Sequence, residues 1–260
     1  MRSNTLFSST KSMRIYLKNL IFSIPLFFCS CNTYKQVTYF QDLNRIEPTK
    51  ESVNNSGTLI IKPDDVLGVS VSSLNAEASA VFNFASNING VNESYGGYLV
   101  NAVGEIEMPL IGAIKASSLT TLQLKDLIRK KLIPFLREPV VRVNLLNFKV
   151  SVLGDVGQPG LFKTQNEKFT ITDALTMAGD LNVTAKRKII LIREENQTRE
   201  YIPIDMTSKS LFNSPYYYLK NNDIIYVEAG SAKYASIDQT YPRIGLLLSL
   251  ISIAAIFIRR

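Results

Sequence analysis

The sequence contains no histidine and only two cysteines, and both shortages exclude chemistry. Without histidine there is no histidine-based catalytic triad, most zinc sites are removed, and no side chain has an ordinary pKa near neutrality. Cys29 and Cys31 stand close together near the N-terminal end, so we expect no disulfide and no thiol site in the rest of the chain. The domains that follow must therefore be stabilised by core burial alone.

Carboxylates are the remaining candidates for acid–base catalysis, because paired carboxylates can hydrolyse glycosides. The pairs Asp64/Asp65, Glu105/Glu107 and Glu194/Glu195 lie in predicted turns or polar segments without a visible pocket signature. We therefore predict no enzyme activity, no catalytic residue, no cofactor and no metal site. An enzyme that acts on glycan stays as an alternative hypothesis.

The net charge of +7 depends largely on the N-terminal end. Residues 1–30 hold four Lys or Arg and no acidic residue, which leaves +3 for residues 31–260. That excess is too small to indicate a nucleic acid partner. The basic runs at residues 129–131 and 186–188 are interpreted as solvated surface, with acidic glycans or neighbouring subunits as the alternative.

Both ends of the chain are apolar, and the N-terminal end is typical of an exported protein. Arg14 and Lys18 precede an apolar stretch that ends in small residues, which predicts a signal peptide over residues 1–30 with Met1 or Met13 as its start. The residues before Cys31 resemble a bacterial lipobox, although phenylalanine stands where leucine is usual. We predict lipidation at Cys31, since the acyl chains would hold the protein on a membrane. An ordinary cleaved signal or an uncleaved anchor helix is the alternative.

The first half of the middle region is predicted to contain strands and one helix. Pro63 followed by Asp64 favours a type I turn between two strands in residues 58–71. Residues 121–132 have apolar positions at helical spacing, and Thr120 with Gln123 can form a capping box. The other predicted segments are a tether with a loop over residues 31–57, a surface loop over residues 75–97, a hairpin joining 98–100 to 106–108, and a strand over residues 140–153 that crosses a domain boundary near Asn147.

The second half is predicted to alternate strands with tight turns. Its segments are a turn-rich stretch marked by Gly154, Pro159 and Gly160, a short helix from about Thr170 to Gly179, a hairpin of residues 189–193 and 198–204, and a final strand over residues 224–227. Asp65 and Asp223 each follow a turn and precede alternating apolar residues. Because Asp can bond the backbone of such a turn, we assign both a structural role and not a catalytic one.

Seven short motifs occur in the order found in one known family. They are KPDDVLGVSV (62–71), GEIEMPLIGAI (104–114), SLTTLQLKDLI (118–128), REPVVRV (137–143), VLGDVGQPG (152–160), DALTMAGD (173–180) and LKNNDIIYV (219–227). On these motifs the chain resembles the Wza-type outer-membrane polysaccharide export lipoproteins. It departs from their usual pattern where Asp64, Asp180 and Asn222 replace glycine.

The resemblance implies an α+β fold in several parts. These are a lipidated N-terminal tether (31–57), a polysaccharide export domain (58–147), a β-grasp-like soluble-ligand-binding (SLBB) domain (148–229), a linker (230–240) and a C-terminal transmembrane helix (241–260). It also implies a homo-oligomeric ring in the outer membrane, lipid-anchored with its main domains in the periplasm. The ring would be a passive channel for capsular or exopolysaccharide and would work with an inner-membrane polysaccharide co-polymerase. An envelope-anchored glycan-binding or assembly-docking module without a channel is the alternative.

The predicted C-terminal helix has a short apolar run. Residues 244–258 would cover about 22 Å as a helix, less than a typical hydrocarbon core of about 30 Å, although the outer membrane is thinner than average. Gly245, Ser249 and Ser252 would share one face, which suits close helix packing or a pore lining. An ordinary hydrophobic anchor explains the same residues.

Overall fold

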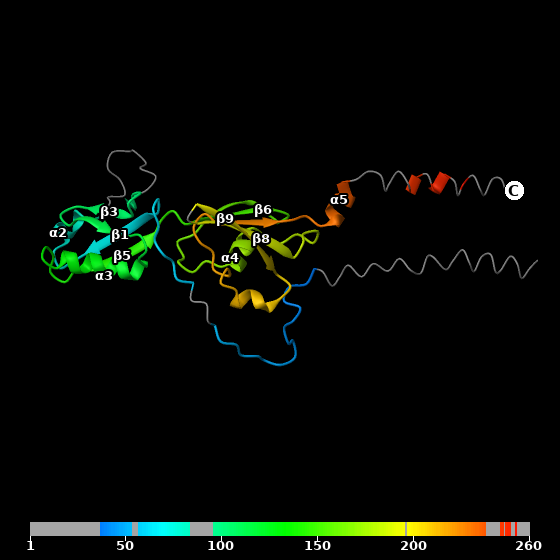
Figure 1. Ribbon diagram of the computed structural model, residues 1–260, viewed down its shortest axis with the longest axis horizontal. Helices are drawn as coiled ribbons and strands as arrows, with labels where there is room; N and C mark the ends of the chain where they lie inside the picture. The colour runs from blue at the N-terminus through cyan, green and yellow to red at the C-terminus, as the bar shows by residue number, and fades with distance from the viewer. Residues whose placement is uncertain are drawn as a thin grey trace, which may run out of the picture. The chain divides into compact units, whose positions relative to one another are not determined.

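The structure is a computed structural model that describes residues 37–53, 57–83, 96–195, 197–237, 245–246, 248–250 and 253 (Figure 1). The chain divides into the units Met1–Thr38 and Tyr39–Arg260, and all described secondary structure belongs to the second unit. The predicted signal peptide and Cys31 lie outside the described residues. Strands and short helices together give a mixed α/β fold with two main sheets, as the α+β prediction required.

The first lobe, residues 58–145, is built around a three-stranded sheet in the order β2-β1-β5. Its strands are β1 (Val66–Ser72), β2 (Tyr98–Leu99) and β5 (Val140–Leu145), with β1 antiparallel to both neighbours. The remaining elements are α2 (Ala76–Ala80), the hairpin of β3 (Glu105–Met108) and β4 (Gly112–Lys115), and α3 (Thr121–Leu132), which packs on β5. Alternate residues of β1 face the core, so the strand has a buried side and an exposed side.

Helix α3 forms as its sequence predicts. The Thr120 hydroxyl accepts from the amide of Gln123 at 3.1 Å, and the Gln123 side chain accepts from the amide of Thr120 at 2.9 Å, which completes the capping box. Leu124, Ile128 and Leu132 are fully buried on one face. Three basic residues in the last turn interact favourably with the negative end of the helix dipole.

The second lobe, residues 149–230, contains a five-stranded mixed sheet in the order β7-β6-β10-β8-β9. Its strands are β6 (Lys149–Gly154), β7 (Gly160–Lys163), β8 (Lys188–Glu195), β9 (Thr198–Asp205) and β10 (Ile224–Val227). Strand β10 runs parallel to β6 and antiparallel to β8. Helix α4 (Ile171–Met177) and the 3-10 helix η3 (Lys209–Asn213) lie on one side of this sheet (Figure 1), and α5 (Ser231–Ile237) follows β10.

Helix α4 begins and ends near the predicted residues. Thr170 is its N-cap in a capping box with Asp173, and Gly179 follows its end with φ +71°. Asp180, one of the positions where the resembling family usually has glycine, has φ +69°. Asparagine and aspartate enter this left-handed region more readily than most residues, so the turn forms without the second glycine.

Several local predictions are wrong. Residues 58–62 form no strand, α2 lies in the expected loop, and β3 pairs with β4 and not with residues 98–100. The predicted long strand over residues 140–153 is two strands, β5 and β6. The strand is interrupted because the Asn147 side chain accepts from the amide of Val66 at 2.9 Å, where a backbone carbonyl would accept in a continuous strand pair. Asp64 has φ +68°, as in a type II turn, because its amide turns to donate to the carbonyl of Val100 at 2.9 Å.

Part of the predicted tether is bound to the second lobe. The amide of Phe40 donates to Met206 O at 3.3 Å and that of Gln41 to Thr207 O at 2.6 Å. The hydroxyl of Tyr39 donates to Asp180 at 2.5 Å. The aromatic ring of Phe40 also lies 4.9 Å, centroid to centroid, from that of Phe212. Residues 39–41 therefore belong to the folded structure.

Most of the predicted transmembrane helix, including Ser252, lies outside the described residues. The parts described, residues 245–246, 248–250 and 253, are helical, and the Ser249 hydroxyl donates to Leu246 O at 2.8 Å. Across the described ranges, none of the helices has the length and apolar character needed to cross a membrane.

Gly154, at the end of β6, tests how closely β6 approaches β10, and Gly160, at the start of β7, is the control. A Cβ on Gly154, which has φ +100°, would lie 1.9 Å from Val227 O, whereas a Cβ on Gly160 would meet nothing nearer than 3.9 Å. We expect Gly154→Ala to lower the free energy of unfolding by about 3 kcal/mol, and Gly160→Ala by less than about 0.5 kcal/mol. Urea denaturation followed by circular dichroism measures both, and equal losses would contradict this packing.

Candidate functional site

Two equivalent turns lie where the first and second lobes meet. In the first, the Asp65 carboxylate accepts from the amide of Lys62 at 2.9 Å, and in the second the Asp223 carboxylate accepts from the amide of Lys220 at 2.7 Å. The residue before each aspartate has φ +68°. Each turn leads directly into a central strand, β1 in the first lobe and β10 in the second.

The two turns are joined by side chains. Glu195 at the end of β8 accepts from Lys62 Nζ through Oε1 at 2.8 Å and from Lys220 Nζ through Oε2 at 2.7 Å. Asn221 donates to the Asp65 carboxylate at 3.0 Å and accepts from the amide of Lys149 at 3.0 Å. These contacts, which we call the junction network, link the export-type motif of the first lobe to the closing motif of the second.

Glu195 carries the central charge of the junction network. Hydrogen bonds from Lys220 and then Lys62 lower its pKa from 4.5 to about 2. The three side chains are 36–44% exposed, so solvent screens them. Each pair then contributes at most about 1 kcal/mol to the free energy of unfolding.

The second turn contains a buried ion pair that the first turn lacks. Arg193 donates through Nε to Asp223 Oδ1 at 2.9 Å and through Nη2 to Oδ2 at 2.6 Å, with the two side chains only 5% and 2% exposed. The Arg193 guanidinium also lies 5.6 Å from the ring centroid of Tyr216. Among the described residues no arginine pairs with Asp65. Burial raises the pKa of Asp65, although its hydrogen bonds oppose this.

A small pocket of about 280 Å³ opens at the junction network. It is lined by both lysines, Glu195, Asp65, Asn221 and Tyr218, among others. Lys62, Lys220 and Glu195 are already paired with one another, so these groups of the lining hold the lobes together.

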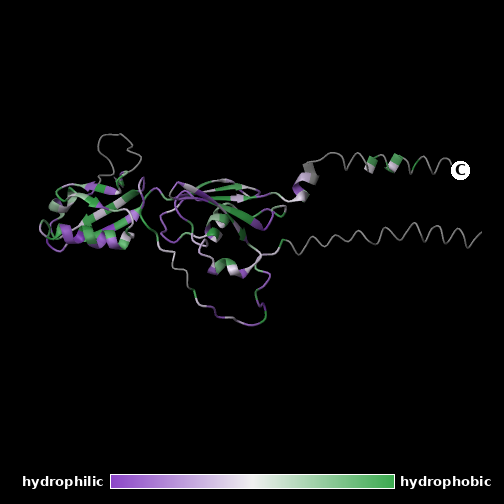
Figure 2. Cartoon of the chain, in the orientation of Figure 1, coloured by the Kyte–Doolittle hydropathy of each residue, from purple (hydrophilic) through white to green (hydrophobic). Residues whose placement is uncertain are grey.

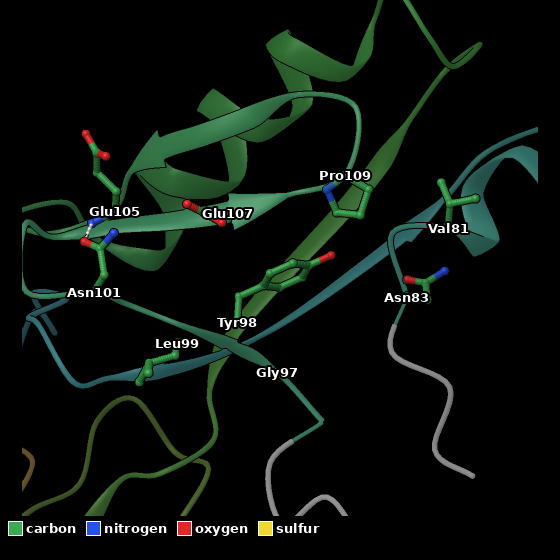
Figure 3. A pocket seen from close by; sticks show the side chains of 9 residues that line it. All are labelled: Val81, Asn83, Gly97, Tyr98, Leu99, Asn101, Glu105, Glu107 and Pro109. Atoms are coloured by element: carbon green, nitrogen blue, oxygen red, sulfur yellow. Dashed lines mark hydrogen bonds between the residues drawn. The ribbon is translucent and has the colours of Figure 1, made fainter. Parts of the chain in front are cut away.

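A second, more open pocket of about 510 Å³ lies beside β2 and β3 (Figure 3). Its lining includes Tyr98, Asn101, Glu105 and Glu107. The Tyr98 hydroxyl donates to Phe82 O at 2.9 Å, and Asn101 accepts from the amide of Glu105 at 2.9 Å. Carboxylate and amide groups on this surface can hydrogen-bond a polar ligand such as a sugar. The sequence showed no pocket at Glu105 and Glu107, because β2 and β3 meet only in the folded lobe.

Of the predicted turn residues, Gly154 ends β6, Gly160 begins β7 and Pro159 lies between these strands, and none of the three is part of the junction network. Beside them, Asp155 is almost fully buried and accepts from Lys233 and Thr184 at 2.6 Å and from Asn182 at 2.9 Å. Burial raises the pKa of Asp155, but these hydrogen bonds outweigh it and hold the pKa below its usual value. Within the described ranges no group of acidic or cysteine side chains is placed to hold a metal ion.

Sequence reasoning gave no role to Asp155 or Arg193, named Asn147 only as a domain boundary, and considered Glu195 only as part of a carboxylate pair. Each acts on residues far away in the chain, so no local pattern marks it. The one available signal is that Arg193 and Glu195 continue a strand whose earlier residues are almost all apolar, and two charged residues at such positions need partners.

We expect the same substitution at Asp65 and at Asp223 to change the free energy of unfolding by different amounts. Asp223→Asn leaves Arg193 buried without its counter-ion, so we expect the free energy of unfolding to fall by about 3–5 kcal/mol. At pH 7 we expect Asp65→Asn to lower the free energy of unfolding by about 1 kcal/mol or less. The raised pKa of Asp65 means that the ionised carboxylate already destabilises the native state at this pH. Denaturant titration of both variants tests this, and similar losses would contradict the assigned role of Arg193.

Glu195→Gln tests the junction network itself. The lowered pKa of Glu195 means that its contribution is fully present above pH 4.5 and is lost as the pH falls through about 2. We expect the substitution to lower stability at pH 7 by about 1 kcal/mol at low salt and by less at 0.5 M salt. Glu107→Gln, on an exposed strand position, should change stability by less than about 0.5 kcal/mol at either salt concentration. A loss at Glu195 that salt does not reduce would argue against the ion pairs.

Comparison with known proteins bears directly on both lobes. Residues 53–146 match the family model described as polysaccharide biosynthesis/export protein, and residues 148–227 match the SLBB domain. The chain is 32% identical over 91 residues to the EPS I polysaccharide export outer membrane protein EpsA of Ralstonia solanacearum, covering 34% of this chain and 24% of the relative. For the EpsA protein of Ralstonia nicotianae the identity is 32% over 94 residues, covering 35% and 25%. The matched segment thus spans about a quarter of the length of each relative.

The two matched ranges are adjacent and coincide with the two lobes that the junction network joins. The family they define is one of export proteins and not of enzymes. The chain therefore contains a polysaccharide biosynthesis/export domain at residues 53–146, followed by an SLBB domain at residues 148–227.

Proposed function

We propose that this protein is an oligomeric outer-membrane lipoprotein that acts as a passive channel for capsular or exopolysaccharide. The observation that carries the proposal is the pairing of an export domain with an SLBB domain, held together by the junction network. The relatives that match it are named as polysaccharide export proteins of the outer membrane. No residue performs chemistry in this proposal, and Asp65 and Asp223 are structural.

The energy for export comes, in this proposal, from polymerisation or from an inner-membrane co-polymerase. The copies form a ring around the polysaccharide, and the helix predicted over residues 241–260 lines a passage or anchors the ring. The bound segment at residues 39–41 supports an attachment of the SLBB lobe close to the membrane. From a lipidated Cys31 to Tyr39, an extended chain spans at most about 29 Å.

A glycan-binding or docking module without a channel is the second candidate. The open pocket beside β2 and β3 favours it, since its lining offers polar groups but no enclosed passage (Figure 3). The two functions differ in whether loss of the protein stops polysaccharide from reaching the cell surface.

Deletion of the gene in its natural host, followed by complementation, tests the export function. We expect surface polysaccharide to fall at least tenfold in the deletion strain and to return with the wild-type protein. Continued surface display at the wild-type level would contradict a role in export. Normal display with weakened retention on the cell would support the glycan-binding module.

The cysteine pair provides the test of lipidation. Cys31→Ser should abolish incorporation of labelled fatty acid and should reduce surface polysaccharide, because the protein loses its anchor. Cys29→Ser, two residues earlier, should leave both unchanged. Labelling that persists in Cys31→Ser would overturn the assigned lipid site.

A further inference from the structure

The loop between α4 and β8, residues 180–187, contacts both the segment that enters the second lobe and the segment that leaves it. The entering segment begins at Tyr39, which the loop contacts through Asp180. The leaving segment follows β10 and continues into α5, and its Gly230 contacts the loop at Thr184. Both segments lie at the same end of the second lobe (Figure 1). We call residues 180–187 the clamp loop.

The entering segment is held by side chains and by the backbone. The Tyr39 hydroxyl donates to Asp180 Oδ1 at 2.5 Å, and the Arg187 guanidinium lies 5.3 Å from the centroid of the Tyr39 ring. The amide of Met206 donates to Arg187 O at 2.8 Å, and the amide of Phe40 donates to Met206 O at 3.3 Å. Asp180 stands where the resembling family usually has glycine, so its contact with Tyr39 is one that a glycine could not make.

The leaving segment pairs with the other half of the clamp loop. The amide of Gly230 donates to Thr184 O at 2.7 Å, and the amide of Lys186 donates to Glu228 O at 2.9 Å. The side chains of Lys186 and Glu228 also form an ion pair of 2.5 Å. These contacts extend the antiparallel pairing of β8 with β10 beyond the ends of both strands.

Helix α5 is attached through an ion pair more than through apolar burial. Lys233 Nζ donates to Asp155 Oδ1 at 2.6 Å, and the Asp155 side chain is only 1% exposed. Ser231, Ala232 and Tyr234 of the same helix are exposed. Figure 2 shows α5 mostly pale and purple, in contrast to the green strands of the sheet. Lys233 is therefore the described side chain of α5 that is anchored on a buried group.

Asn182 links the two attachments inside the clamp loop. Its side-chain amide donates to Asp155 Oδ1 at 2.9 Å, and its carbonyl accepts from Arg187 Nη1 at 2.7 Å. Direct contacts thus run from the Tyr39 ring through Arg187, Asn182 and Asp155 to Lys233. Arg187 and Asp155 are both buried, and a buried charged group that loses one of its partners is costly. A loss at either end therefore disturbs the loop that holds the other.

We propose that the clamp loop fastens the entering and leaving segments to each other, so that release of either one loosens the other. The proposal rests on the proposed function for one point, namely that Cys31 and residues 241–260 attach to the membrane. An extended chain spans at most about 29 Å from residue 31 to residue 39, and about 14 Å from residue 237 to residue 241. The clamp loop thereby limits where both attachments of one copy can enter the membrane.

Hydrogen exchange of the full-length protein in detergent, followed by mass spectrometry, tests the coupling. Lys233→Met removes the cation but keeps a long side chain. We expect amide exchange over residues 230–237 to become roughly fivefold faster, and that of Phe40 and Gln41 roughly threefold faster, although their link to Lys233 runs through three other side chains. Tyr39→Ala should in turn accelerate exchange over residues 230–237 by roughly threefold. Absence of either remote effect would overturn the proposal.

Two control variants and two core strands separate this coupling from a general loss of stability. Lys233→Arg keeps the cation, so exchange at both segments should stay within about twofold of the wild type. Arg199→Met removes an exposed ion pair with Glu194 at the turn between β8 and β9, and it should change neither segment. Exchange in β6 and β10 should be unchanged in every variant. Equal acceleration in those two strands would also overturn the proposal, because Lys233 would then stabilise the lobe as a whole.

The exchange measurement and the deletion strain can fail independently. Wild-type protein that shows coupled exchange but does not restore export would count against the channel and leave the clamp loop standing. Wild-type protein that restores export, while its variants show no remote effect, would overturn the clamp loop and leave the export function standing.

Discussion

The feature on which the described structure most depends is the pair of turns closed by Asp65 and Asp223. In each, a carboxylate holds the amide of a lysine three residues earlier, and the same lysine then reaches Glu195. One glutamate thereby fixes two turns that start the central strands of two sheets. The export domain and the SLBB domain are joined by a side-chain network as well as by the chain at Asn147, whose side chain donates to Asp64 O and accepts from the amide of Val66.

This arrangement uses ionisable side chains for structure. Lys62 and Lys220 of the junction network are both paired with Glu195, and a more buried pair, Arg193 with Asp223, closes the second turn. Such pairs add little net stability, because solvent screens the exposed ones and desolvation offsets the attraction within the buried one. The exposed apolar side chains Leu161 and Tyr201 lie elsewhere, on β7 and β9 of the SLBB sheet.

Local chemistry explains what the sequence could predict. The capping boxes at Thr120 and Thr170, the helix stop at Gly179 and the hairpin of β8 and β9 each depend on residues close together in the chain. The order of seven motifs was enough to identify the family. The ion pairs of Arg193 and Glu195 and the interruption at Asn147 depend on residues 25 or more positions apart. The partner of β3 depends on competition between strands. Periodicity encodes neither kind of contact.

The central claim is that copies of this chain assemble into a conduit for polysaccharide. Electron microscopy of the full-length protein in detergent tests it most directly. The account predicts closed rings of copies around a central passage. A stable monomer, or particles without a central passage, would contradict it.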